Sequence, residues 1–95
     1  MPTDLLLTIE HLAQQGRFQA IVEGHRCVCD YRLVGSVMHM THTEVAPEVE
    51  GRGIAAALVE AALAHAQAHG LKVNPLCSYV RGYMRHHPET ATLLA

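Results

Sequence analysis

The stretch Glu50-Gly51-Arg52-Gly53-Ile54-Ala55 decides the fold of this chain. Its two glycines let the backbone adopt angles closed to other residues, and they let a ligand approach the main chain closely. A long apolar helical pattern follows at once, so the stretch leads into a helix N-terminus, where the first N–H groups have no acceptor within the helix. These groups and the helix dipole attract anions. The stretch therefore predicts a binding site for a phosphate-bearing cofactor.

The residues after this stretch predict one long helix. It is expected to begin near Gly51 or Arg52 and to run to about His69, because apolar residues recur at helical spacing and form a wide stripe. Gly70 has the position of a glycine that ends a helix in the left-handed conformation. Two shorter elements are expected beyond it: a strand at Leu71–Val73 that Asn74-Pro75 ends, and a helical segment at Cys77–His86.

The residues before the glycine turn predict an antiparallel meander. Apolar and polar residues alternate, as in strands with one buried face, in the segments Arg17–Val22, Arg26–Leu33 and Val37–Val45. Short turns join these segments, and such connections pair neighbouring strands antiparallel. The apolar residues of Leu5–Leu12 fit either a further strand or a short helical face. Residues 1–95 are therefore expected to form a single mixed α/β domain.

Composition excludes several classes of partner. Seven Lys plus Arg stand against nine Asp plus Glu, so the chain lacks the basic patch that is typical of nucleic-acid binding. No apolar run approaches the roughly 20 residues of a membrane span. Leu5-Leu6-Leu7 is too short for a signal peptide and lacks its basic flank. We therefore expect a cytoplasmic protein with free cysteines, a monomer or weak homodimer that binds neither nucleic acid nor membranes.

The order of elements and the glycine turn together resemble the GNAT acyltransferase superfamily, and more closely its small single-domain branch of YjdJ-type N-acetyltransferases. The superfamily turn reads Gln/Arg-x-x-Gly-x-Gly/Ala; this chain matches it at Gly53 and Ala55 and has Glu50 in the first place. Longer strings carry the closer resemblance: His42–Val45, Glu50–Val59 and Pro75–Val80. The resemblance implies the GNAT-like acyl-CoA N-acyltransferase fold, a mainly antiparallel curved sheet of about five strands with one long phosphate-binding helix and a short C-terminal helix.

The same resemblance implies that the chain binds acetyl-CoA or CoA. The pyrophosphate would lie on the turn, and the pantetheine arm between two splayed strands that end near Val45 and Val73. The expected cofactor contacts are Thr43, Glu44, Val45, Gly51, Arg52, Gly53, Ile54, Ala55, Cys77 and Tyr79. No metal site is expected, because Cys27 and Cys29 have no second pair of ligands at zinc spacing.

Charged side chains at the turn have two interpretations. Glu50 would repel a pyrophosphate, so we interpret Glu48 and Glu50 as partners of the positive end of the helix dipole. Arg52 either compensates the charge of a phosphate or is a solvated residue at the start of the helix.

The candidates for the chemistry of acetyl transfer are Cys77, Tyr83 and His42. Cys77 begins the second helical segment, close to where the resemblance places the thioester sulfur. Three interpretations of this residue are open: a nucleophile, a proton donor, or a small buried hydrophobic residue. In the superfamily a tyrosine of this helix protonates the CoA thiolate; that role would pass to Tyr83 or to Tyr79, and each also fits a tyrosine at the edge of the core. His42 is either a general base for the amine or a structural polar residue.

The resemblance implies transfer of an acetyl group from acetyl-CoA to an amine. Longer members carry helices between the first two strands that wall the acceptor site, and here only Ala13–Gly16 lies there. The acceptor is therefore expected to be an amine of a small molecule or of a protein or peptide, and an exposed amine on a protein or peptide fits such an open site better. One alternative is a CoA-binding module without catalysis. Another is a nucleotide or other phosphate binder, which the lack of a Walker lysine after Gly53 disfavours.

Overall fold

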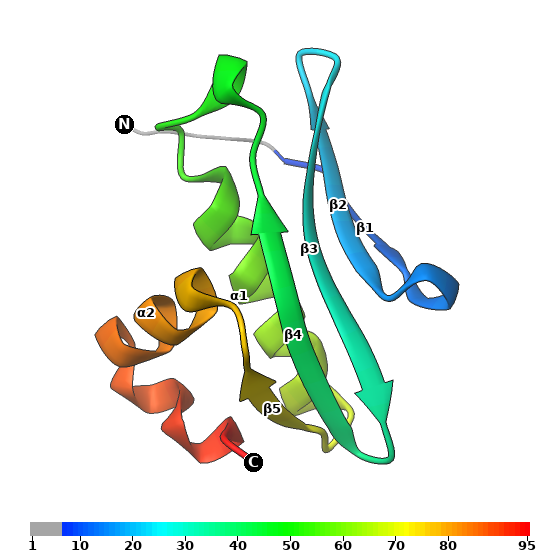
Figure 1. Cartoon of the computed structure of the whole chain (residues 1–95), viewed down its shortest axis with the longest axis vertical. Helices are drawn as coiled ribbons and strands as arrows, with labels where there is room; N and C mark the ends of the chain where they lie inside the picture. Colours follow the sequence, from blue (N-terminus) through cyan, green and yellow to red (C-terminus); the bar gives the residue numbers. More distant parts are fainter. Residues whose placement is uncertain (1–6) are drawn as a thin grey trace.

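A five-stranded sheet forms the frame of the molecule (Figure 1). The computed structural model describes residues 7–95. The strands lie in the sheet in chain order: β1 (Ile9–Leu12), β2 (Arg17–Val22), β3 (His25–Val34), β4 (Val37–Glu44) and β5 (Lys72–Pro75). The first four pair antiparallel, which confirms the predicted meander, whereas β4 and β5 pair parallel. Of the ambiguous segment Leu5–Leu12, the last four residues form β1, and Leu5 and Leu6 lie outside the described residues.

Two α-helices complete the mixed α/β fold and confirm the predicted fold class. α1 (Ile54–Ala68) follows the glycine turn, and α2 (Ser78–His86) follows β5. Short 3₁₀ segments lie between or after these elements, at Ala13–Gln15, Pro47–Val49 and Pro88–Leu93. The start of α1 is later than predicted, because Gly51 and Gly53 have φ angles of 81° and 78°, left-handed values that an α-helix excludes.

The hydrophobic core lies between the sheet and both helices. α1 packs across β2, β3 and β4 and passes behind β4 in Figure 1, and α2 packs against β4 and β5. The largest fully buried side chains come from the sheet, from both helices and from the 3₁₀ turn before α1: Met38, Met40, Val49, Ile54, Leu58, Val59, Val73 and Val80. Burial of one such aliphatic side chain contributes about 1.5–3 kcal/mol. Ala62 and Ala66 are also fully buried on α1, which lets the helix approach the sheet closely.

The two parallel strands part after a short stretch of pairing. β5 pairs with β4 as far as Met40, and the chain then turns away into α2 while β4 continues to Glu44. The carbonyl of Met40 accepts the N–H groups of Leu76 and Cys77, at 3.0 and 2.9 Å, at the point of divergence. β5 ends at Pro75, two residues beyond the predicted end at Val73, because an edge strand tolerates the missing N–H of a proline.

A β-bulge in β4 changes which of its side chains face the core. The register with β3 shifts at Thr41, which has no partner of its own on that strand. Met40 faces the core before the bulge, and Thr43, which pairs with the buried Cys29, faces the same side after it. The bulge therefore points Thr43 toward the region where β4 and β5 diverge.

Candidate functional site

The glycine turn and the first turn of α1 enclose a cavity of about 340 Å³. Gly51 and Gly53 both have positive φ, and a Cβ on either would meet no atom within 4 Å. The glycines therefore serve the backbone conformation and leave open space above the turn. Because α1 begins at Ile54, its first N–H groups have no acceptor within the helix and can bind an anion. The residues that line the cavity are Val45, Glu50, Gly51, Gly53, Ile54, Ala55, Ala56 and Tyr79, which include most of the predicted cofactor contacts.

Arg52 is turned toward a neighbouring loop. Its guanidinium donates two hydrogen bonds to the carboxylate of Glu23, at 2.5 and 3.3 Å. Glu23 lies between β2 and β3 and has a φ of 51°, which is uncommon for a residue other than glycine. The contact raises the pKa of Arg52 and lowers the pKa of Glu23, first through the hydrogen bond and then through the opposite charge. A phosphate on the turn would therefore bind Arg52 together with Glu23, or it would replace Glu23 as the partner of Arg52.

The two carboxylates that the sequence assigned to the helix dipole lie in different surroundings. Glu50 lines the turn cavity itself. Glu48 lies in the 3₁₀ segment before the turn, with its carboxylate 3.6 Å from the Nδ1 of His25. Together with Glu23 they make the rim of the turn rich in carboxylates, so an anion there relies on backbone N–H groups and Arg52.

Cys77 occupies the N-cap position of α2, directly where β4 and β5 diverge. Its Sγ lies 3.5 Å from the Oγ1 of Thr43. The Cys77 thiol donates to this hydroxyl oxygen. Burial raises the pKa of the Cys77 thiol, but the proximity of the Thr43 side chain and of the backbone N–H groups of Val80, Tyr79 and Thr43 outweighs burial, and the net pKa is lowered. These donors stabilise a thiolate. The structure thus brings two predicted site residues, Cys77 and Thr43, into contact, in surroundings that lower the pKa of the thiol.

A second thiol contacts Thr43 from the other side. The Thr43 hydroxyl donates to the Sγ of Cys29 at 3.8 Å. Cys29 is 1% exposed, and burial raises its pKa to about 11, so this thiol stays protonated at neutral pH. Of the two thiols at Thr43, Cys77 is the one whose pKa is lowered. Cys27, Cys29 and Cys77 are all free, as expected.

His42 and Glu44 lie on the opposite face of β4 from Thr43, because successive side chains of a strand alternate. The Nε2 of His42 and the Oε1 of Glu44 are 3.0 Å apart, and their side chains are 56% and 68% exposed. The structure therefore joins His42 to Glu44 and separates both from the Cys77 thiol. Glu44, a predicted cofactor contact, does not line the turn cavity.

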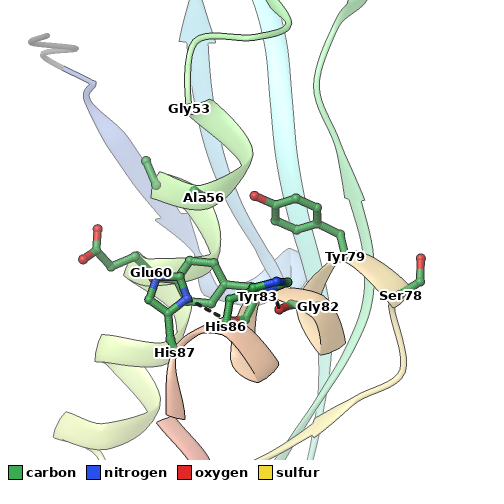
Figure 2. Close-up of a pocket in the computed structure, with 10 residues that line it drawn as sticks. Gly53, Ala56, Glu60, Ser78, Tyr79, Gly82, Tyr83, His86 and His87 are labelled. Carbon is green, nitrogen blue, oxygen red and sulfur yellow. Dashed lines mark hydrogen bonds between the residues drawn. The ribbon is translucent and has the colours of Figure 1, made fainter. Parts of the chain in front are cut away.

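A larger cavity of about 680 Å³ lies between α1 and α2 and shares Gly53, Ala56 and Tyr79 with the turn cavity. We call it the interhelical groove; Figure 2 shows the residues that line it, which are Gly53, Ala56, Ala57, Glu60, Ser78, Tyr79, Gly82, Tyr83, His86 and His87. Burial raises the pKa of both tyrosines. Tyr79 reaches the turn cavity, whereas Tyr83 lies six residues after Cys77, about 9 Å further along the helix axis.

Sequence reasoning misses Glu60 and Gly82 as residues of this groove. It interprets His86 and His87 as solvated or helix-end residues, or as a pair that lines a substrate mouth, and the structure places both in the lining of the groove. Nothing in the polarity of Glu60 distinguishes it from other exposed glutamates. Gly82 does carry a signal, because a glycine in the middle of a helical pattern weakens the helix and needs a reason to be there. That signal identifies the position but not the cavity that it faces.

Two further kinds of site are absent from the part of the chain that the structure describes. Within residues 7–95, no three or more His, Cys, Asp or Glu side chains gather so that they could hold a metal ion. Over the same residues, no helix has the length and apolarity needed to cross a membrane.

Comparisons with known proteins bear on the whole of this arrangement. Residues 17–93 match the family model of the GCN5-related N-acetyl-transferase. The chain is 34% identical over 85 residues to Protein NATD1 of Mus musculus, which covers 86% of this chain and 77% of that protein. It is 33% identical over 85 residues to Protein NATD1 of Homo sapiens, which covers 86% of this chain and 75% of that protein. The residues that match the family model include the turn, both helices and Cys77.

Proposed function

The chain belongs to the GCN5-related N-acetyltransferase family, and we propose that it transfers an acetyl group from acetyl-CoA to an amine. The observation that carries the proposal is an anion cavity beside a thiol of lowered pKa. Val45 and Tyr79 line the cavity, and each lies two residues from one member of the Thr43–Cys77 contact. A site for a diphosphate and a reactive sulfur are therefore close together on one side of β4.

The backbone supplies most of the binding in this proposal. The N–H groups of the first turn of α1 would hold the diphosphate of acetyl-CoA, whose thioester supplies an activated acetyl group. Beyond Met40, β4 has no strand on its β5 side among the described residues, so N–H groups that point there are available to a carbonyl oxygen. Such donors stabilise the negative charge that develops on that oxygen during acyl transfer.

Cys77 is the residue that we assign to the transfer itself. Its thiolate attacks the carbonyl carbon, the bond from that carbon to the sulfur of CoA breaks, and the proton that Cys77 lost passes to the CoA thiolate. The neutral amine then attacks the acetyl-cysteine, an amide forms, and the amine proton returns to the Cys77 sulfur. In a direct transfer without this intermediate, the Cys77 thiol would instead give its proton to the departing CoA thiolate.

The acceptor that we propose is an exposed amine on a protein or peptide. Only the short segment Ala13–Gln15 connects β1 and β2, so this connection leaves the outer face of the sheet open. On that face the carboxylate of Glu44 would attract an ammonium group, and the imidazole of His42 would take its proton before the amine passes to the opposite side of β4, where Cys77 lies. The exposure of both side chains suits a large acceptor better than a metabolite held in a pocket.

Intact mass spectrometry after mixing with acetyl-CoA tests the transfer step. The protein should gain one acetyl group, and Cys77→Ala should lose this adduct and roughly a hundredfold or more of the turnover with a peptide amine. Cys29→Ala is the matched control, because it removes the other thiol at Thr43 and should keep the adduct. Circular dichroism of each variant verifies that it is folded.

A binding module without catalysis is the second candidate, and the position of His42 on the opposite face of β4 from Cys77 favours it. That module would bind CoA and acetyl-CoA with saturation, form no adduct, and acetylate no peptide amine. An adduct that persists in Cys77→Ala would contradict the role assigned to this thiol.

A further inference from the structure

A further pocket, of about 420 Å³, lies between α2, the end of β5 and the 3₁₀ segment Pro88–Leu93. We call it the arginine pocket, because Arg81 and Arg85 both line it. It shares no lining residue with the turn cavity or the interhelical groove. The reason is helical spacing, which puts Arg81, Met84 and Arg85 together on a different face of α2 from the one that borders the groove.

The end of the chain forms one wall of this pocket and is anchored to β5. Figure 1 shows the last segment, in red, returning from α2 toward β5, where Leu94 forms a parallel bridge with Val73. The N–H of Ala95 donates to the carbonyl of Val73 at 3.0 Å. The Nζ of Lys72 donates to the carbonyl of Thr92 at 2.8 Å. Several contacts therefore hold the wall in place, and the pocket is formed before any ligand enters.

Apart from its two arginines, the pocket is apolar. Met84 is only 6% exposed, whereas Leu94 stays 45% exposed although its side chain is apolar. The other apolar residues of the lining are Pro75, Pro88 and Ala91. An apolar ligand would remove this surface from water, and the volume is that of a site for a small molecule.

Two guanidinium groups border this apolar lining without a carboxylate partner among residues 7–95. The Nη1 of Arg81 donates to the carbonyls of Leu76 and Pro75, at 2.7 and 3.3 Å, which fixes the side chain at the pocket and leaves Nη2 and Nε available. Two other arginines of the chain, by contrast, form ion pairs with carboxylates. The pocket therefore has unused donors for an anion.

The spacing of the two arginines adds a second reason to expect an anion. Arg85 follows Arg81 by four residues, and like charges at this spacing repel each other and destabilise a helix. The negative end of the helix dipole favours Arg85, and the two carbonyls bind Arg81, but neither contact neutralises the charge that both bring to one pocket. An anion between them would do so.

We propose that the arginine pocket binds a small carboxylic acid, with its carboxylate between Arg81 and Arg85 and its apolar body against Met84 and Leu94. Guanidinium groups bind carboxylates through paired, charge-assisted hydrogen bonds. The apolar lining selects acids with an aliphatic or aromatic body over acetate, which has almost none. This site is independent of acetyl transfer, because its lining includes neither the glycine turn nor Cys77.

Nuclear magnetic resonance titration of the ¹⁵N-labelled chain with three probes tests the proposal. Octanoate has both parts of the ligand, octan-1-ol lacks the carboxylate, and acetate lacks the apolar body. Octanoate should shift the amide signals of Arg85, Ala91 and Leu94 with saturation. Each of the other two probes should bind at least tenfold more weakly, because each loses one half of the contacts.

Arg85→Gln should weaken octanoate at least fivefold and leave octan-1-ol unchanged, whereas Ala91→Phe should fill the pocket and weaken both. Arg26→Gln is the matched control, because it removes the same charge from an exposed position on β3 and should leave octanoate binding unchanged. Circular dichroism verifies that each variant is folded.

Three results would each overturn the inference: octanoate shifts that do not saturate, shifts centred on the glycine turn, or equal octanoate affinity in Arg85→Gln and the unaltered protein. The proposed function would stand in each case, because the acetyl adduct at Cys77 is measured separately.

Discussion

Arg52 and Glu23 form an ion pair beside the turn that would hold a diphosphate. The pair is exposed, and its two hydrogen bonds fix the guanidinium in the direction of the β2–β3 turn. A planar guanidinium binds phosphate as readily as carboxylate, so an incoming diphosphate competes with Glu23 for Arg52. Glu48 and Glu50 add further negative charge at the same place.

We predict that Glu23→Gln binds CoA several-fold more tightly, because a neutral amide competes less well for Arg52. Calorimetric titration at low ionic strength measures the gain, which should shrink in high salt as exposed charges are screened. Glu48→Gln is the matched control, because Glu48 contacts His25 and leaves Arg52 paired. Weaker binding by Glu23→Gln would show instead that Glu23 holds Arg52 in the conformation that binds the ligand.

At the scale of residues, the sequence places Cys77 at the start of a helix, and the structure confirms this position. The sequence does not predict the contact with Thr43, because that contact depends on the bulge at Thr41 and on the divergence of β4 and β5. The interpretation of Arg52 as solvated or phosphate-binding also misses Glu23, a partner distant in sequence. Contacts of this kind arise from tertiary packing, which local pattern does not encode.

At the scale of elements, a histidine cluster joins β1 to the last turns of α1. His11 stacks on Phe18 with centroids 4.1 Å apart and meets the edge of His65 at 4.4 Å, and His65 stacks on His69 at 4.1 Å. The Nε2 of His11 also lies 2.6 Å from the hydroxyl of Tyr31. Burial lowers the pKa of His11 and His65, and neighbouring histidines lower both further.

This cluster predicts a loss of stability in mild acid. The folded-state pKa values of His11 and His65 lie below 6.5, so the unfolded chain binds protons first as the pH falls. The stabilisation is present above pH 6.5 and is lost as the pH falls from there through the lowered pKa values. Thermal unfolding at a series of pH values measures it, and His65→Phe should flatten the dependence because it keeps a ring without a charge.

His42→Gln is the control for this prediction, because His42 lies exposed on the other face of the sheet and should leave the pH dependence intact. An unchanged dependence in His65→Phe would assign the acid sensitivity to other groups.

The sequence pattern predicts which segments form strands and helices, but it does not predict all of their ends. Alternation and short turns predict β2, β3 and β4 within a residue or so, because each has one buried face. The start of α1 differs because Gly51 and Gly53 adopt left-handed angles that apolar periodicity does not reveal. The end of β5 differs because Pro75 lies on an edge strand, a fact that only the sheet order supplies.

At the scale of the whole molecule, one parallel pairing creates the site. β5 joins β4 only briefly before it leads into α2, so the N-termini of α1 and α2 both lie near the open side of β4 (Figure 1). Thr43 and Cys77 are in contact there, and Val45 and Tyr79, each two residues from one of them, line the cavity of the glycine turn. The interhelical groove extends between the two helices. The sequence predicts this layout through a family resemblance, whereas the groove itself follows from how the two helices pack.

Titration calorimetry with acetyl-CoA, CoA and ATP tests most directly whether the turn is a CoA site. We predict saturable binding of both CoA species, weak or no binding of ATP, and a loss of at least tenfold in Gly53→Asp, because a carboxylate there repels the diphosphate. Gly70→Asp is the matched control, since Gly70 also has positive φ but follows the other end of α1. Absence of CoA binding, or equal affinity in Gly53→Asp and the unaltered protein, would contradict the assignment of the turn to the cofactor.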